Sequence, residues 1–403
     1  MNDATMRAGL IAASVLVAAA AVLSLAHPNS SAAPGAAPRT VAASTRPTPI
    51  AAPSVDTTAS PSQTITVPTT PAVASAPTQP ANLARMIGQQ LMVGMAGTAP
   101  DSNLLERVHA GQVGGVIIYG RNAKSPAQLQ QATADLQQAA VSGGNPRLLI
   151  ATDQEEMTVR HIWWAPPTLT APQLAAAGSA AIQNQGYETG LALRRVGVNM
   201  DLAPVLDVAH SSSVFIWQQE RSYSMNPQTV TAAGSAFMYG LNFARVAATA
   251  KHFPGLGGVA LDTDSYRQSV QLTSADLVPF SKLIGELVPA IMTSLATYTN
   301  YDPHYPAALS PRIVTGLLRD QLHYQGVVIT DNLPGSTGLS VGQAAIAAEQ
   351  AGDDIILAST SEKDGADAYN ALLSAAEHGQ LTAAQVNAAY QLIIALKQKY
   401  ANP

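Results

Sequence analysis

The stretch Thr249-Ala250-Lys251-His252-Phe253-Pro254-Gly255 starts as an apolar strand and ends as a loop, with a lysine and a histidine at the boundary. A continuous apolar run of this kind is typical of a parallel strand that is buried on both faces. Charged residues make up 12% of the chain, about half of the ~25% usual in soluble proteins. A Lys-His pair inside such a run therefore indicates a functional site at the end of the strand.

Eight runs of this type occur along the chain, and segments of helical periodicity lie between them. The expected strands are Gln90–Gly94, Val113–Tyr119, Arg147–Asp153, Val198–Leu202, Ala247–His252, Ala290–Ser294, Gly326–Asp331 and Asp354–Ala358. The expected helices are Pro126–Val141, Pro172–Arg195, Pro227–Arg245, Ser274–Leu287, Pro311–Leu322, Val341–Ala351, Gly365–His378 and Thr382–Tyr400. This alternation predicts an α/β fold, a (β/α)8 TIM-type barrel, with an open doubly wound sheet as the alternative.

The N-terminus has the composition of a targeting segment followed by a stem. Arg7 precedes an uncharged run, Gly9 to Ala26, which is typical of a signal peptide and is also long enough for a retained membrane anchor. Either reading of residues 1–27 places the rest of the chain outside the cytoplasm. Residues 28–81 are rich in Ala, Pro, Ser and Thr and predict a disordered stem. Residues 82–403 are then the single globular domain, a barrel with C-terminal helices.

Composition excludes several kinds of site and binding partner. The chain has no cysteine, which excludes disulfides, a thiolate nucleophile and cysteine metal sites. Its formal net charge of −5 argues against nucleic acid, because a polyanion binder needs a basic face. The eight histidines show no metal spacing, and the glycines after Pro254 lack the helix that a dinucleotide site needs. We expect no metal, no cofactor, a monomer, and membrane contact only through the N-terminal segment.

Polar side chains gather where the expected strands end. In a barrel these carboxyl ends converge on one face, where binding and catalysis take place. The residues are Asp153-Gln154-Glu155-Glu156, Asp207, Lys251-His252, Thr293-Ser294 and Thr330-Asp331-Asn332. Together they predict a polar pocket for a hydroxyl-rich ligand. Carboxylates without cysteine suit glycosidic chemistry, and Asp331, at the end of an apolar strand, has the rigid setting that a nucleophile needs.

The chain resembles the N-terminal barrel domain of family 3 glycoside hydrolases, a group that includes bacterial β-N-acetylhexosaminidases acting on cell-wall sugars. The resemblance extends from about Ile87 to Leu357. The segments that carry it are Val113–Ile117 with Gly120-Arg121-Asn122, Asp153-Gln154-Glu155, Gly197–Val208, Arg221-Ser222-Tyr223, Lys251–Gly255, Leu309-Ser310-Pro311, Leu318-Arg319, Gly326–Leu333 and Ala351–Asp354. The fold that the resemblance implies is the same barrel.

The resemblance also implies roles for individual residues. Asp331 matches the family's catalytic nucleophile. Four residues match groups that hydrogen-bond the sugar, namely Asp153, Arg221, Lys251 and His252. In the hexosaminidase branch, the loop after Lys-His-Phe-Pro-Gly carries an Asp-Ser-His triplet in which the histidine is the general acid/base and the aspartate orients it.

Five positions depart from the family pattern, and one of them is Leu256, which stands in place of the usual second histidine after Pro-Gly. The triplet reads Asp262-Thr263-Asp264, so the orienting Asp262 is kept and Asp264 stands in place of the histidine. The paired glycines of the Asp-Gln-Glu-Gly-Gly pattern are replaced by Glu156 and Met157. The last sugar-binding arginine of that pattern corresponds to His161.

Two functions remain open from the sequence. The first is a retaining glycoside hydrolase of the β-N-acetylhexosaminidase type, acting on cell-wall or related N-acetylglucosamine-containing glycans, with Asp264 as acid/base. Like-charge repulsion from a nearby carboxylate would help Asp264 keep its proton. The second is a barrel with impaired catalysis that binds cell-wall glycan or acts as a surface scaffold.

Overall fold

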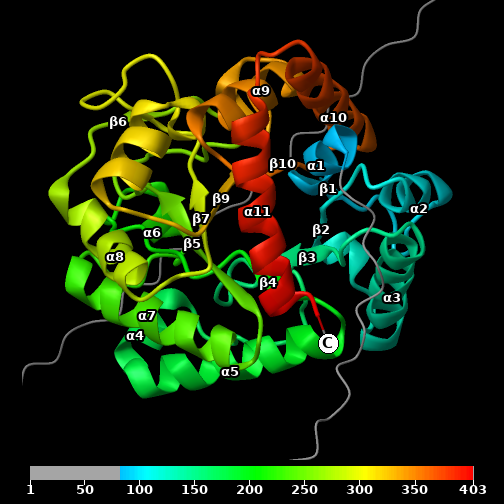
Figure 1. The fold of residues 1–403 in the computed structure, drawn as a ribbon. Helices are drawn as coiled ribbons and strands as arrows, with labels where there is room; N and C mark the ends of the chain where they lie inside the picture. The colour runs from blue at the N-terminus through cyan, green and yellow to red at the C-terminus, as the bar shows by residue number, and fades with distance from the viewer. Residues whose placement is uncertain (1–81, 403) are drawn as a thin grey trace, which may run out of the picture. The chain divides into compact units, whose positions relative to one another are not determined.

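Eight parallel strands form a single sheet in the computed structural model, which describes residues 82–402; the expected leader and stem, residues 1–27 and 28–81, lie outside the described residues (Figure 1). The strands are β1 (Leu91–Gly94), β2 (Gly115–Ile118), β3 (Leu149–Thr152), β4 (Met200–Asp201), β5 (Ala247–Phe253), β7 (Ala290–Thr293), β9 (Val327–Thr330) and β10 (Ile356–Ala358). Each lies within one residue of a predicted strand or inside it. Their order in the sheet is β10-β1-β2-β3-β4-β5-β7-β9.

The sheet curls until its two edge strands meet. Ile329 of β9 forms a parallel bridge with Ile355, the residue before β10. The backbone N–H of Thr330 donates to the carbonyl of Ile355 at 3.0 Å. The predicted (β/α)8 barrel is therefore confirmed, and the open doubly wound sheet is wrong.

Helices surround these strands, and they begin where the sequence places capping residues. The longer ones are α3 (Pro126–Ser142), α5 (Ser179–Arg195), α7 (Pro227–Phe243), α8 (Ser274–Gly285), α9 (Val341–Ala351), α10 (Glu362–Glu377) and α11 (Ala383–Tyr400). Shorter helices are α1 (Leu83–Gln89), α2 (Ser102–His109), α4 (Ala171–Ala177) and α6 (Phe215–Gln218). Ser125 and Asn226 cap α3 and α7 through their side chains, and a proline follows each cap.

Two expected helices differ in the structure. The predicted helix Pro172–Arg195 is broken into α4 and α5 at Gly178, whose φ of 88° is a conformation that side-chain-bearing residues rarely adopt. The predicted helix Pro311–Leu322 is a π-helix, η3 (Arg312–Gln321), in which the hydrogen bonds span one residue more than in an α-helix.

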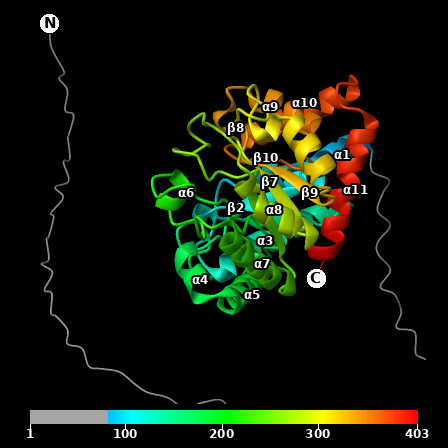
Figure 2. The same ribbon diagram turned by 90° about the vertical axis from the view of Figure 1, so that its left-hand side faces the viewer.

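The interior of the barrel is apolar, and α11 closes one end of it. Buried side chains from the strands of the barrel, such as Met92, Ile117 and Met292, pack together with Ile393 and Tyr400 of α11. Figure 1 shows α11 running across the strands, and Figure 2 shows it on the opposite side from α6. Because the end of the barrel where the strands start is covered, a ligand can enter only where they end.

The loops beyond the strands carry a second, two-stranded sheet. In it β6 (Ser269–Val270), on the loop after β5, pairs in parallel with β8 (Thr297–Tyr298), on the loop after β7. Three short 3-10 turns, η1 (Gly120–Asn122), η2 (Ala307–Leu309) and η4 (Gly335–Thr337), lie in other loops. Among residues 82–402, none of the helices has the length and apolar character needed to cross a membrane.

Candidate active site

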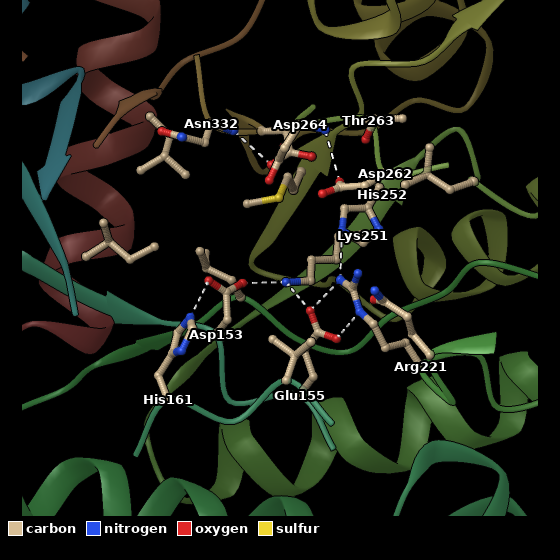
Figure 3. Close-up of a pocket in the computed structure, with 18 of the residues that line it drawn as sticks. Asp153, Glu155, His161, Arg221, Lys251, His252, Asp262, Thr263, Asp264 and Asn332 are labelled. Carbon is tan, nitrogen blue, oxygen red and sulfur yellow. Dashed lines mark hydrogen bonds and ion pairs between the residues drawn. The ribbon is translucent and has the colours of Figure 1, made fainter. Parts of the chain in front are cut away.

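A cavity of about 310 Å³ opens at the carboxyl ends of the strands. All of the side chains predicted as site residues line it. They are Asp153, His161, Arg221, Lys251, His252, Asp262, Asp264 and Asp331. Figure 3 shows most of them pointing toward the same space from different strands and loops. The structure thus brings these residues together around one cavity, and their roles there stay a prediction.

An ion network of alternating sign forms one wall of the cavity. The Lys251 ammonium lies 2.5 Å from Asp153 Oδ1 and 2.7 Å from Glu155 Oε1. The Arg221 guanidinium donates to both oxygens of Glu155, each at 2.7 Å, as Figure 3 shows. Because each buried charge has a partner of opposite sign, the network holds the side chains in fixed positions.

The network also fixes the charge states. Burial alone would raise the pKa of Asp153, but Lys251 and His161 outweigh it and hold that pKa well below its usual range. Burial is likewise outweighed at Glu155, where Arg221 and Lys251 lower the pKa to about 2. Burial opposes the charge of Lys251, yet Asp153 and Glu155 raise its pKa above the usual value. The wall therefore presents ionised groups, which suit sugar hydroxyls.

His252 is held by a carboxylate behind it. Its Nδ1 lies 2.7 Å from Asp207 Oδ2, and its backbone N–H donates to Asp207 Oδ1 at 3.1 Å. Its other ring nitrogen, Nε2, lies 3.4 Å from the Arg221 guanidinium. His161 lies on the opposite side of Asp153, with Nε2 at 3.7 Å from Asp153 Oδ2. Both histidines thus border the cavity next to an acid.

Asp331 is fixed by the end of its strand. Its backbone N–H donates to the carbonyl of Thr293 on β7 at 2.9 Å, and its Oδ1 accepts the backbone N–H of Asn332 at 2.8 Å. A carboxylate at the end of a rigid strand, lining a cavity, has the placement required of a nucleophile.

Asp264 comes from the loop after β5 and lines the same cavity. Its backbone N–H donates to Asp262 Oδ1 at 3.1 Å, so Asp262 orients the backbone of Asp264. Repulsion from the Asp331 carboxylate, then burial and repulsion from Asp262, raise the pKa of Asp264 to about 8. Asp264 as a whole residue is exposed, which agrees with repulsion, rather than burial, being the larger cause. At neutral pH this carboxyl holds a proton.

Some residues of the site had been given no individual role by the sequence. Glu155 and Asp207 anchor the residues that face the cavity, and Tyr119 and Asn332 line it. Glu155 and Asp207 stand inside the strand-end motifs that marked the site, so their positions carried a signal. Tyr119 carried none, since its place in the pocket follows only from the closure of the barrel.

Glu156, which stands where the family pattern has a glycine, is buried. Glu156 accepts a hydrogen bond from the hydroxyl of Tyr223, and burial raises the pKa of Glu156 to about 8. Arg160 turns away from the cavity and donates to the carbonyl of Pro167 at 2.8 Å. His161, rather than Arg160, therefore stands beside Asp153. Within residues 82–402, no group of three or more His, Cys, Asp or Glu side chains is placed to hold a metal ion.

Comparison with known proteins agrees with this geometry. The family model "Glycosyl hydrolase family 3 N terminal domain" matches residues 82–396. The chain is 33% identical over 343 residues to an uncharacterized secreted glycosyl hydrolase of Arthroderma benhamiae, covering 81% of this chain and 97% of that protein. It is 33% identical over 272 residues to a beta-hexosaminidase of Methylococcus capsulatus, covering 64% of this chain and 79% of that protein. The crystal structure of a beta-N-acetylhexosaminidase from Beutenbergia cavernae superposes with a TM-score of 0.75 at 31% identity, covering 79% of this chain and 99% of that one.

The ion network makes Glu155 important for stability. We expect Glu155→Ala to lower the free energy of unfolding by about 3–5 kcal/mol, because it leaves the cations of Arg221 and Lys251 without their shared carboxylate. Urea unfolding followed by circular dichroism measures the change. The matched control is Asp367→Ala, which breaks the exposed pair with Lys363 and should leave the midpoint unchanged. Equal midpoints for the two variants would contradict this account of the network.

Proposed function

The chain belongs to glycosyl hydrolase family 3, and we propose that it is a retaining β-N-acetylhexosaminidase that acts on N-acetylglucosamine-containing glycans such as those of cell walls. The names of similar proteins, beta-hexosaminidase and beta-N-acetylhexosaminidase, support the substrate class. The observation that carries the proposal is that Asp331 and Asp264 line one cavity. Repulsion from Asp331, the largest cause, raises the pKa of Asp264 to about 8, which favours its protonated form at neutral pH. A retaining glycosidase needs this combination of a nucleophile and an acid.

In the first step, the Asp331 carboxylate attacks the anomeric carbon of the sugar. The bond from that carbon to the leaving oxygen breaks, and Asp264 gives its proton to that oxygen. The products are a covalent glycosyl ester on Asp331 and the released alcohol, with Asp264 now ionised. The proton donor is here a carboxylic acid, at the position where the family pattern has a histidine.

In the second step Asp264 acts as a base, because the first step has removed the negative charge of Asp331. The ester on Asp331 carries no negative charge, so the main cause of the raised pKa of Asp264 is absent. Asp264 can then accept a proton from a water molecule that attacks the anomeric carbon. Hydrolysis of the ester restores the Asp331 carboxylate and returns Asp264 to its protonated form.

The ionised wall of the cavity binds the sugar during both steps. Asp153 offers carboxylate oxygens to hydroxyl groups, while Lys251 and Arg221 offer donors and His252 lies beside Arg221 at the edge of the cavity. His161, beside Asp153, takes the place of the arginine expected from the family pattern. Because the ion network already fixes these groups, little side-chain entropy is lost when substrate binds.

Substitution of the two acids tests the mechanism. With a chromogenic aryl N-acetyl-β-glucosaminide, we expect Asp331→Asn to abolish turnover, since no other carboxylate stands at the end of β9. Asp264→Asn should lose ~10²-fold to 10⁴-fold on a substrate with a sugar leaving group, which needs a proton, and far less on a nitrophenyl substrate. A wild-type rate no higher than that of Asp331→Asn would contradict hydrolysis and favour a glycan-binding barrel.

The pH profile tests the protonation state of Asp264. The protonated form is the active one in the first step, so kcat/KM for a sugar leaving group should fall as the pH rises through about 8. The Asp264→Asn variant should lack this basic limb. A wild-type profile that is flat from about pH 6 to about pH 9, the range in which Asp264 is expected to titrate, would contradict the assignment.

We also propose that the protein works outside the cytoplasm as a monomer, with residues 1–27 as leader or anchor and residues 28–81 as a stem. The uncharged run Gly9 to Ala26 supports this, as does the name of the Arthroderma benhamiae relative, which calls it secreted. Intact mass and N-terminal sequencing of the protein recovered from cells test it. A mature chain that begins near residue 27, or an intact chain in the membrane fraction, is expected; an intact chain in the cytosol would contradict it.

A further inference from the structure

The two acids of the proposed mechanism come from different loops, and the loops meet at an arginine. Asp264 and Arg267 belong to the loop after β5, and Asp331 precedes the loop that contains η4. The Arg267 guanidinium donates from Nε to the carbonyl of Ser336 at 3.0 Å and from Nη2 to the carbonyl of Thr337 at 2.7 Å. We propose that Arg267 is a positioning residue that clasps the Asp264 loop to the Asp331 loop and so sets the separation of the two carboxyls.

Hydrogen bonds within residues 261–268, the Asp264 loop, connect Arg267 to Asp264. A displacement of Arg267 is therefore expected to move Asp264 as well. The backbone N–H of Tyr266 donates to the Asp262 carbonyl at 2.9 Å, and that of Asp264 donates to the Asp262 side chain at 3.1 Å. The side chain of Gln268 accepts the N–H of Leu261 at 3.3 Å and donates to the carbonyl of Arg267 at 3.0 Å. These bonds link the two ends of the segment that carries Asp264.

The C-terminal end of the Asp264 loop is held by a different part of the barrel. β6 pairs with β8, and the N–H of Thr297 donates to the carbonyl of Gln268 at 2.9 Å. That pairing ties the loop to the loop after β7, not to the loop after β9. Arg267 therefore supplies the bonds that hold the loop against η4, the side on which Asp331 stands.

The loop after β9, which supplies the two carbonyl acceptors, leaves room for the Arg267 guanidinium at Gly338. Gly338, next to Thr337, has a φ of 77°, and a Cβ added there would lie 1.5 Å from Arg267 Nη2. A side chain at this position would thus both strain the backbone and displace the arginine. The planar fork of an arginine donates to two neighbouring carbonyls from two nitrogens in a fixed geometry, whereas a lysine offers one nitrogen on a flexible stem. The clasp consequently depends on the arginine itself and not only on its positive charge.

The clasp proposal rests on the proposed roles of Asp331 and Asp264, and it predicts a particular pattern of loss. Arg267→Ala and Arg267→Lys should each lower kcat/KM at least ~10-fold for a sugar leaving group, but less than ~3-fold for a nitrophenyl substrate, because only the former needs a placed acid. As Asp264 moves away from Asp331, the repulsion that raises its pKa weakens, so the basic limb of the profile should shift to lower pH.

The experiment compares Arg267→Ala, Arg267→Lys, Gly338→Ala and Asp264→Asn with the wild type, with unfolding midpoints measured for each. Arg195→Ala, an exposed arginine in the last turn of α5, is the matched control and should behave as wild type. Gly338→Ala should reproduce the pattern of the Arg267 variants.

Three results would overturn the clasp. If Arg267→Lys keeps wild-type selectivity and basic limb, charge alone is sufficient. If both Arg267 variants equal wild type while Asp264→Asn loses activity on the sugar leaving group, the clasp is wrong and the acid role of Asp264 stands. If Asp264→Asn also equals wild type, the clasp and the proposed mechanism fail together.

Discussion

The repulsion between two carboxyl groups, Asp331 at the end of β9 and Asp264 on the loop after β5, is the interaction on which the proposed chemistry depends. In water two carboxylic acids of this kind would both be ionised at neutral pH. In the cavity, the charge of one keeps the proton on the other, so a single residue type supplies both the nucleophile and the acid. The barrel matters because it brings these two segments to one face.

The other charged groups of the cavity leave the raised pKa of Asp264 in place. Lys251 and Arg221 are each paired with Asp153 or Glu155. The lowering effect of Arg221 on the pKa of Asp264 is outweighed by repulsion from Asp331, Asp262 and Asp153 together with burial. Had either cation faced Asp264 alone, its field would have lowered the pKa of Asp264 and released the proton. The ion network and the two acids, Asp331 and Asp264, are thus two parts of one electrostatic arrangement.

Much of the fold follows from the sequence because the strands of a closed parallel barrel are buried on both faces. Runs such as Gly326–Asp331 are therefore continuous and apolar, and the polar residues that end them mark the site. The break at Gly178 was missed because a glycine inside a helical pattern is often tolerated. The π-helix at Arg312–Gln321 was missed because its apolar spacing is close to that of an α-helix.

The protonation of Asp264 and the hydrogen bonds of Arg267 are beyond sequence reasoning, since both depend on how two distant loops approach each other. The most direct test of the central claim is a carbon-13 NMR titration of the Asp264 carboxyl in the wild type and in Asp331→Asn. We expect a pKa of about 8 in the wild type and a clearly lower value in the variant. An ordinary aspartate pKa in the wild type, or the same raised value in both proteins, would contradict the account.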